Sequence, residues 1–167
     1  ADLEGLKMRI PGLGGEVLKR AGGTPVNMPG GEIFTSLQQG TIDATEWVGA
    51  YHDLRLGLYQ AAKYYYYPGF HEPGTYLEYF FNKKAYESLP KDLQHIIDAA
   101  CVETEHWVLA QFEALNGQAL QTLINDKKVQ LMQFPDQVLV DLRKLADEVI
   151  AEEAAKTPIA TKVNDAF

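Results

Sequence analysis

The sequence predicts an α/β fold with a mixed, mostly parallel sheet, followed by long C-terminal helices. Two observations lead to this fold class. Before Pro90, short stretches rich in β-formers alternate with short helical stretches, and glycine and proline separate them. After Pro90, apolar residues recur at steps of three and four, which is the period of an amphipathic helix.

The first half contains three strand–helix pairs. Residues 6–10 alternate apolar and basic side chains up to Pro11, which indicates a strand, and the following helix stops at Gly22 and Gly23. The pairs are expected at strands 6–10, 25–28 and 41–47 and at helices 14–21, 31–39 and 48–62. Strands joined by helices pair in parallel, so these units predict a layered α/β sheet.

Further elements follow from local composition. Residues 64–67 and 75–82 are rich in β-formers and are expected to be strands. A long helix runs from Pro90 to Asn125, and a short edge strand is expected over residues 129–132. Another helix starts at Pro135, breaks at Thr157–Pro158 and is followed by one short helix. The expected inward faces of the two long helices comprise Leu93, Ile96, Ile97, Ala100, Val108, Phe112, Leu115 and Leu123, and Val138, Leu142, Leu145 and Val149.

Composition limits the functions to consider. The 167 residues carry 23 acidic and 15 basic side chains, a net charge of −8, which argues against nucleic-acid binding. No uninterrupted apolar run approaches the roughly 20 residues of a membrane-spanning helix. The single cysteine, Cys101, permits neither an internal disulfide nor a thiolate zinc cluster.

Several common motifs are incomplete. The glycines at residues 12–15 resemble a dinucleotide-binding turn, but Val17 stands where the last glycine or alanine belongs. His71 and Glu72 do not form a zinc-protease motif, because Thr75 occupies the position of the second histidine. No serine lies in a G-x-S-x-G turn, so covalent catalysis has no support.

Four residues form a candidate ligand site. Arg9 lies on a strand, and its forked guanidinium suits a carboxylate ligand, although a surface arginine paired with a glutamate is an equally good reading. Glu46 and Trp47 end a predicted strand, where open α/β sheets place their ligands. Glu72 is a second acid that could converge on Glu46, and two such carboxylates would need a cation or a proton between them.

Three segments resemble the solute-binding proteins of tripartite ATP-independent periplasmic (TRAP) transporters, the DctP-like family. Residues 3–12 (LEGLKMRIPG) resemble its "L-x-G-L-K-x-R" strand. Residues 29–47 (PGGEIFTSLQQGTIDATEW) are similar to its "E-x-(Y/F)-x-A-L-Q-x-G-x-(V/I)-D-G-x-E" segment, with Ser36 and Ala44 as small departures. Residues 65–74 (YYYPGFHEPG) resemble the branch that binds 2-oxo acids such as pyruvate.

The resemblance implies a two-lobed receptor of the type II periplasmic-binding-protein class that closes around its ligand. Arg9 would hold the substrate carboxylate, and the Trp47 ring and Phe70 would line the pocket. The Glu46 side chain, the Trp47 backbone carbonyl and Glu72 would coordinate a cation, sodium or calcium, with no other cofactor. The protein would act in the periplasm, deliver its ligand to membrane subunits and have no enzymatic activity.

The resemblance also bears on chain length. Residues 1–167 are expected to be the second lobe and helical extension, with the N-terminal lobe and a final, dimer-forming helix absent. The isolated chain is then expected to bind its ligand weakly, with a dissociation constant above about a micromolar. Two other readings stay open: a metal-dependent enzyme acting on a small keto acid, and a structural module whose acids are solvated.

Overall fold

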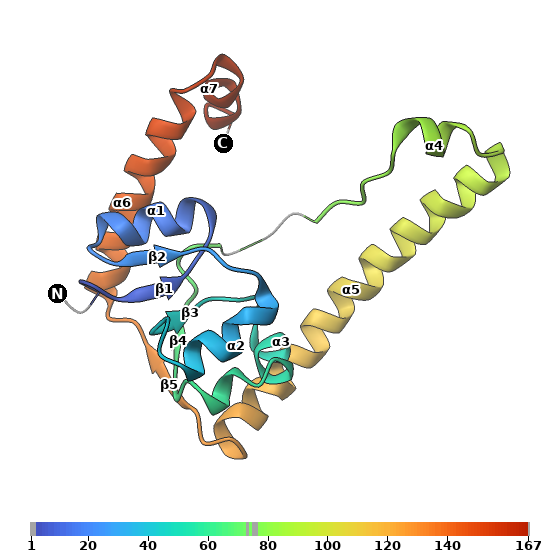
Figure 1. The fold of residues 1–167 in the computed structure, drawn as a ribbon. Coiled ribbons are helices and arrows are strands. Elements are labelled where there is room, and N and C mark those ends of the chain that lie inside the picture. The colour runs from blue at the N-terminus through green and yellow to red at the C-terminus, as the bar shows by residue number, and fades with distance from the viewer. Residues whose placement is uncertain (1–2, 73, 75–76, 167) are drawn as a thin grey trace.

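The computed structural model describes residues 3–72, 74 and 77–166. Its first sheet consists of β1 (Lys7–Arg9), β2 (Thr24–Val26) and β3 (Ala44–Thr45), all parallel, in the order β2-β1-β3 (Figure 1). Arg9 lies opposite Val26 on one side and Thr45 on the other. The central strand therefore places Arg9 at the middle of the carboxyl edge of this sheet.

Helices α1 (Gly12–Arg20), α2 (Gly30–Gln38) and α3 (Ala50–Arg55) alternate with these strands, as predicted. The single helix expected over residues 48–62 is wrong, because the chain turns at Gly57, whose φ is 71°. Glycine adopts this left-handed conformation at little cost and so ends a helix readily. A short 3₁₀ helix, η1 (Leu58–Gln60), follows.

Strand β3 is shorter than the predicted residues 41–47, although backbone pairing extends beyond it. The Asp43 amide donates to the Lys7 carbonyl at 2.7 Å, and the Glu46 amide donates to the Arg9 carbonyl at 3.1 Å. These bonds hold the chain against β1 on both sides of the assigned strand. Glu46 is therefore positioned directly beside Arg9.

A second, separate parallel sheet pairs β4 (Tyr64–Tyr67) with β5 (Gln130–Gln133). The strand predicted over residues 75–82 is wrong for residues 77–82, which form no strand, whereas Thr75 and Tyr76 lie outside the described residues. Instead, the Asn82 side chain accepts a hydrogen bond from the Ala85 amide and caps a helix that the sequence did not predict, α4 (Lys83–Glu87).

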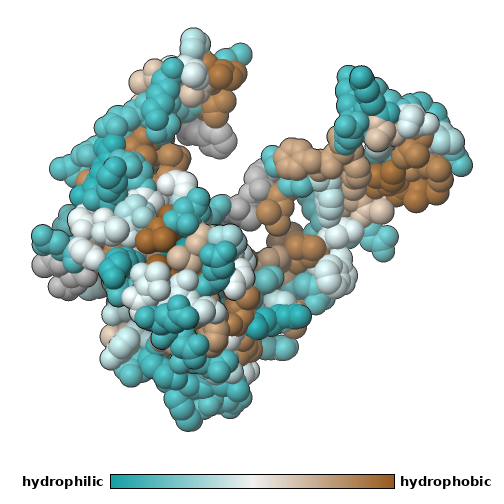
Figure 2. Space-filling model, viewed as in Figure 1, coloured by the Kyte–Doolittle hydropathy of each residue, from teal (hydrophilic) through white to brown (hydrophobic). Residues whose placement is uncertain are grey.

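The long helix α5 (Lys91–Asn125) has two different parts. Its C-terminal part packs on α3 through a buried cluster that contains Ala50, Ala119 and Leu123. Its N-terminal part projects away from the sheets and carries α4 at its far end (Figure 1). The inward face expected there is wrong, since Ile96 is 63% exposed, and Figure 2 shows brown apolar surface along this projection.

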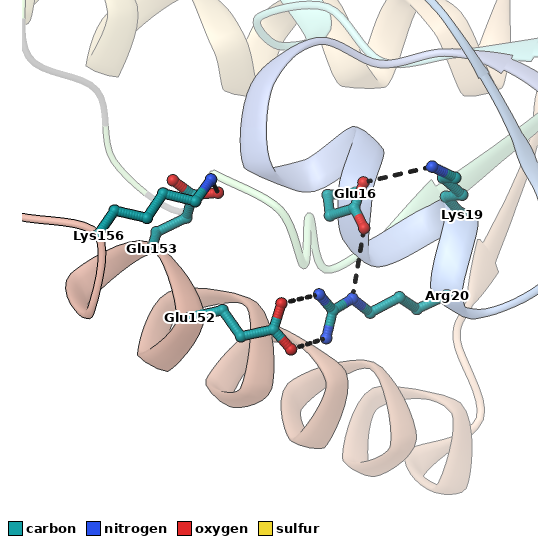
Figure 3. Close-up of polar contacts among 6 residues, drawn as sticks. All are labelled: Glu16, Lys19, Arg20, Glu152, Glu153 and Lys156. Atoms are coloured by element: carbon teal, nitrogen blue, oxygen red, sulfur yellow. Dashed lines mark hydrogen bonds and ion pairs between the residues drawn. The ribbon is translucent and has the colours of Figure 1, made fainter.

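Helices α6 (Asp136–Ala154) and α7 (Pro158–Asn164) complete the chain. Leu142 and Val149 of α6 are buried against Val17 of α1, as the sequence predicted for the α6 face. At the edge of this contact, the two terminal guanidinium nitrogens of Arg20, Nη1 and Nη2, donate to the Glu152 carboxylate at 2.9 and 2.5 Å (Figure 3). The mixed helical and parallel-sheet fold class is confirmed.

Within the described residues, no helix combines the length and the apolar character that crossing a bilayer requires.

Candidate functional site

Arg9 is a buried cation at the end of the central strand. Its side chain is 11% exposed, and its Nε donates to the Met28 carbonyl at 3.3 Å. Its Nη1 pairs with Oε1 of Glu46 and lies 3.5 Å from the Glu46 carbonyl oxygen. Arg9 thus has a glutamate partner, which was one of its two sequence readings, but the pair is buried instead of lying on the surface.

Glu46 links this arginine to a second segment of the chain. Its side chain is only 8% exposed, and its two carboxylate oxygens face different partners. Oε1 faces Arg9, and Oε2 lies 3.0 Å from Nε2 of His71. A buried carboxylate is costly unless it is paired, and these two contacts provide the pairing.

The Trp47 ring forms an apolar wall beside the arginine. The Arg9 guanidinium carbon lies 5.1 Å from the ring centroid, which is the geometry of a cation–π contact. The ring also packs against the cluster of Ile33, Leu37, Ile42 and Leu58. Trp47 therefore fixes the orientation of Arg9 from one side, while Met28 and Glu46 bond it from others.

The segment after β4 supplies two further side chains that could bind a metal ion, His71 and Glu72. Glu46, His71 and Glu72 each offer one donor atom, and these three atoms lie within 4.8 Å of one another. The segment can come this close to α1 because residue 14 is glycine, where a Cβ atom would lie 2.9 Å from the His71 Cβ. Two carboxylates and an imidazole this close together suit a bound cation. The predicted convergence of Glu46 and Glu72 is therefore present, which disfavours a structural module with solvated acids.

Phe70 lies beside this cluster without joining it. Its ring packs against the buried Val17–Leu142–Val149 cluster and meets the His71 ring edge-on at 5.5 Å between centroids. It supports His71 from behind. Its predicted contact with a ligand stays a prediction, as does the role of the Trp47 carbonyl.

A buried bond connects the two segments that carry the donor atoms. Tyr65 of β4 donates its hydroxyl to Oδ2 of Asp53 on α3 at 2.5 Å, and Asp53 is 8% exposed. Burial raises the pKa of Asp53 to about 6, with a smaller upward contribution from the charge of Glu46, while the Tyr65 bond works in the opposite direction. Burial and the neighbouring Asp53 raise the pKa of Tyr65, so its hydroxyl stays protonated and donates.

Helix α3 is also held from the other side. Asn116 of α5 accepts a hydrogen bond from the Tyr51 amide at 3.0 Å and so satisfies one of the free amides at the start of α3. Asp53 Oδ1 is buried and has no partner of hydrogen-bond geometry among the described residues. These contacts fix the helix that follows Glu46 and Trp47.

Sequence reasoning missed His71, Asp53 and Asn116. His71 was set aside because no second histidine has ligand spacing, yet its partners come from a distant strand end. The available signal was a His–Glu dipeptide in a Pro/Gly-rich turn, which offers two donors at one place. No sequence signal marks Asp53 or Asn116, whose contacts cross 12 and 65 residues.

The comparisons with known proteins agree on one family. Residues 1–157 match the family described as bacterial extracellular solute-binding protein, family 7 (DctP). A monocarboxylate 2-oxoacid-binding periplasmic protein from Nostoc sp. is 45% identical over 156 residues, covering 93% of this chain and 43% of the relative. The chain belongs to this family of solute-binding proteins, as its three motif segments predicted.

Solved structures of TRAP periplasmic solute-binding proteins have the same fold. One from Colwellia psychrerythraea, with bound calcium and pyruvate, is 45% identical with a TM-score of 0.91, covering 98% of this chain and 50% of that one. One from Pseudoalteromonas atlantica, with sodium and pyruvate, is 44% identical with a TM-score of 0.89, covering 97% and 49%. The chain thus spans about half the length of these relatives.

Proposed function

We propose that this member of the family 7 solute-binding proteins serves TRAP-type uptake in the periplasm. The ligand would be a small carboxylate, a 2-oxo acid such as pyruvate, held together with a cation. The observation that carries the proposal is the buried Arg9–Glu46 pair adjoining the Glu46–His71–Glu72 cluster. It combines a carboxylate-binding group and a cation-binding group in one place.

The roles of the residues follow from their contacts. Arg9 offers a fixed guanidinium, oriented by Met28 and Trp47, and a ligand carboxylate would share or replace its contact with Glu46. Glu46 and Glu72 would hold the cation, which supplies positive charge to a ligand oxygen when bound. The donor set fits such an ion, because carboxylate oxygens are the ligands that sodium and calcium prefer.

The relatives support the choice of ligand and cation. Proteins that are 44–45% identical to this chain have structures with pyruvate and with calcium or sodium. A third, from Bordetella bronchiseptica, is 37% identical with a TM-score of 0.86, covers 97% of this chain and 48% of that one, and is a mixed-occupancy dimer with calcium and picolinate. These ligands share a carboxylate beside a second donor atom, which is a suitable arrangement for Arg9 and an adjoining cation.

The activity proposed is that of a larger receptor. Because the chain spans about half the length of its relatives, we propose that it supplies the second lobe and that a first lobe closes over the site. Delivery to membrane subunits and pairing of two complete receptors belong to the same proposal. A receptor that closes on its ligand needs no chemical step, so we propose binding without turnover.

A titration of the chain with pyruvate tests this function. Saturation-transfer NMR suits the weak binding expected of one lobe, with calcium present or removed by a chelator. We expect pyruvate contact that requires calcium and that Arg9→Lys weakens at least about tenfold, since lysine keeps the charge but loses the forked geometry. Arg20→Lys is the matched control, because Arg20 pairs with Glu152 on α6, away from the site.

Two outcomes would contradict the proposal. Pyruvate contact that is equal with and without calcium would remove the cation from the mechanism. New signals from a converted substrate in the same spectra would favour the keto-acid enzyme, which was the alternative from the sequence.

A further inference from the structure

We propose that the buried Tyr65–Asp53 hydrogen bond is a positioning device for the ligand site and that it holds His71 against Glu46. Tyr65 and Asp53 are then positioning residues, since they act through other side chains and do not touch the ligand. The proposal rests on the proposed function, because the Glu46–His71 contact lies in the proposed ligand site.

Two contacts connect the same two segments of the chain, one nested inside the other. The outer contact joins Glu46 Oε2 to His71 Nε2 at 3.0 Å and spans 25 residues. The inner contact joins Asp53 on α3, which follows Glu46, to Tyr65 on β4, which precedes His71, and it spans 12 residues. Because loop closure becomes less probable as the 3/2 power of loop length, bridging about half of the outer loop favours its closure roughly threefold.

The inner contact is buried and held on both sides. Asp53 is 8% exposed, and the Tyr65 ring packs against the buried cluster where α5 meets α3. Strand β4 pairs with β5 along its whole length. Burial raises the pKa of Tyr65, so its hydroxyl stays protonated and remains the donor of this bond. Both ends of the bond therefore belong to packed elements, and the bond can fix the distance between them.

The inner pair is costly for the fold, which favours a functional role over a purely structural one. Oδ1 of Asp53 is buried and has no partner of hydrogen-bond geometry in the part of the chain that the structure describes. A buried carboxyl group with one unpaired oxygen costs free energy that an apolar side chain of similar size would not. Holding two distant segments together gives a reason for an acid at this position.

A second tyrosine–aspartate pair provides a matched control. Tyr86 of α4 donates its hydroxyl to Asp98 of α5 at 2.6 Å, and this bond also spans 12 residues. Both residues lie on the exposed projection, away from the sheets (Figure 1). Removing each tyrosine hydroxyl therefore makes the same chemical change inside and outside the nested loop.

NMR of the histidine rings tests the proposal without a ligand. Long-range ¹H–¹⁵N spectra report the ring signals of His71, with the histidines of α5 as internal references. We expect Tyr65→Phe, which keeps the ring and removes only the hydroxyl, to shift the His71 signals, and Tyr86→Phe to leave them unchanged. Asp53→Ala should shift them as well, whereas Asp53→Asn should preserve them, because its amide oxygen still accepts from Tyr65.

Pyruvate titrations in calcium measure the consequence for binding. Tyr65→Phe should weaken pyruvate binding about threefold, while Tyr86→Phe should not change it. The proposal is wrong if Tyr65→Phe leaves the His71 signals or the pyruvate affinity unchanged, or if Asp53→Asn shifts the signals as Asp53→Ala does. If the signals shift as expected but the parent chain binds no pyruvate, the positioning of His71 stands and the proposed function fails.

Discussion

The α/β region around β1 and the projecting part of α5 differ in what covers their helices. Ile33 of α2 is completely buried, in a cluster that also contains Leu37 and Ile42. Ile96 of α5, which belongs to a similar apolar pattern, is 63% exposed. The two isoleucines have the same side chain and the same helical environment, so the difference lies in the surrounding elements.

A regular spacing of apolar residues predicts a helix but does not predict which element packs against its apolar face. Helix α2 lies beside the sheet and η1, which together cover its apolar face. The N-terminal part of α5 has α4 at its tip and projects from the sheets (Figure 1). The candidate site lies in the packed region, where the surrounding elements can fix side chains such as Arg9.

The largest expected effect comes from replacing one isoleucine by alanine in each region. Ile33→Ala should lower the free energy of unfolding by about 2–5 kcal/mol, because it leaves a cavity in a closed cluster. Ile96→Ala should change it by less than about 0.5 kcal/mol, since its side chain is largely in water. Urea denaturation monitored by circular dichroism measures both. Equal losses would show that the projecting part of α5 is covered in solution.

The pH dependence of stability tests the buried acid of the packed region. The pKa of Asp53 is raised from 3.8 to about 6, so the folded state binds its proton more tightly than the unfolded state does. The favourable contribution of protonated Asp53 is therefore full below about pH 4 and is lost as the pH rises through about 6. Over this range the free energy of unfolding falls by about 3 kcal/mol.

An Asp53 variant isolates this contribution. Asp53→Asn should remove the decrease in stability that Asp53 causes between pH 4 and 7. Denaturant midpoints measured across this pH range test the expectation. Glu105→Gln, on the exposed part of α5, is the matched control. If the Asp53→Asn and parent profiles decline equally, burial does not control this carboxyl group.

The smallest expected change in stability concerns the contact between α5 and α3, where the two regions meet. Asn116→Ala removes the side-chain acceptor of the Tyr51 amide and should cost about 1 kcal/mol, as the loss of a helix cap does. Glu105→Ala, in the projecting part of the same helix, should cost less than about 0.5 kcal/mol. Thermal unfolding compares the two variants, and an equal effect would show that the Asn116 bond contributes nothing to the attachment of α3.

Most elements could be predicted because their signals are local. The helix periods, the prolines at helix starts and the alternating β1 segment all lie within short windows, and the parallel pairing follows from strand–helix order. The break at Gly57 was missed because glycine inside a helical pattern is often tolerated. The strand expected over residues 75–82 was wrong for its described part, because a β-rich composition forms a strand only where a partner is available.

The sequence alone determined the α/β class, the family resemblance and the site candidates Arg9, Glu46, Trp47 and Glu72. The tertiary structure decided which of their atoms meet: Arg9 with Glu46 Oε1, His71 with Oε2, and Tyr65 with Asp53. It also decided which apolar faces are covered. Backbone preferences and periodicity act over a few residues, whereas ligand sets and burial depend on contacts between distant segments, which chain order does not specify.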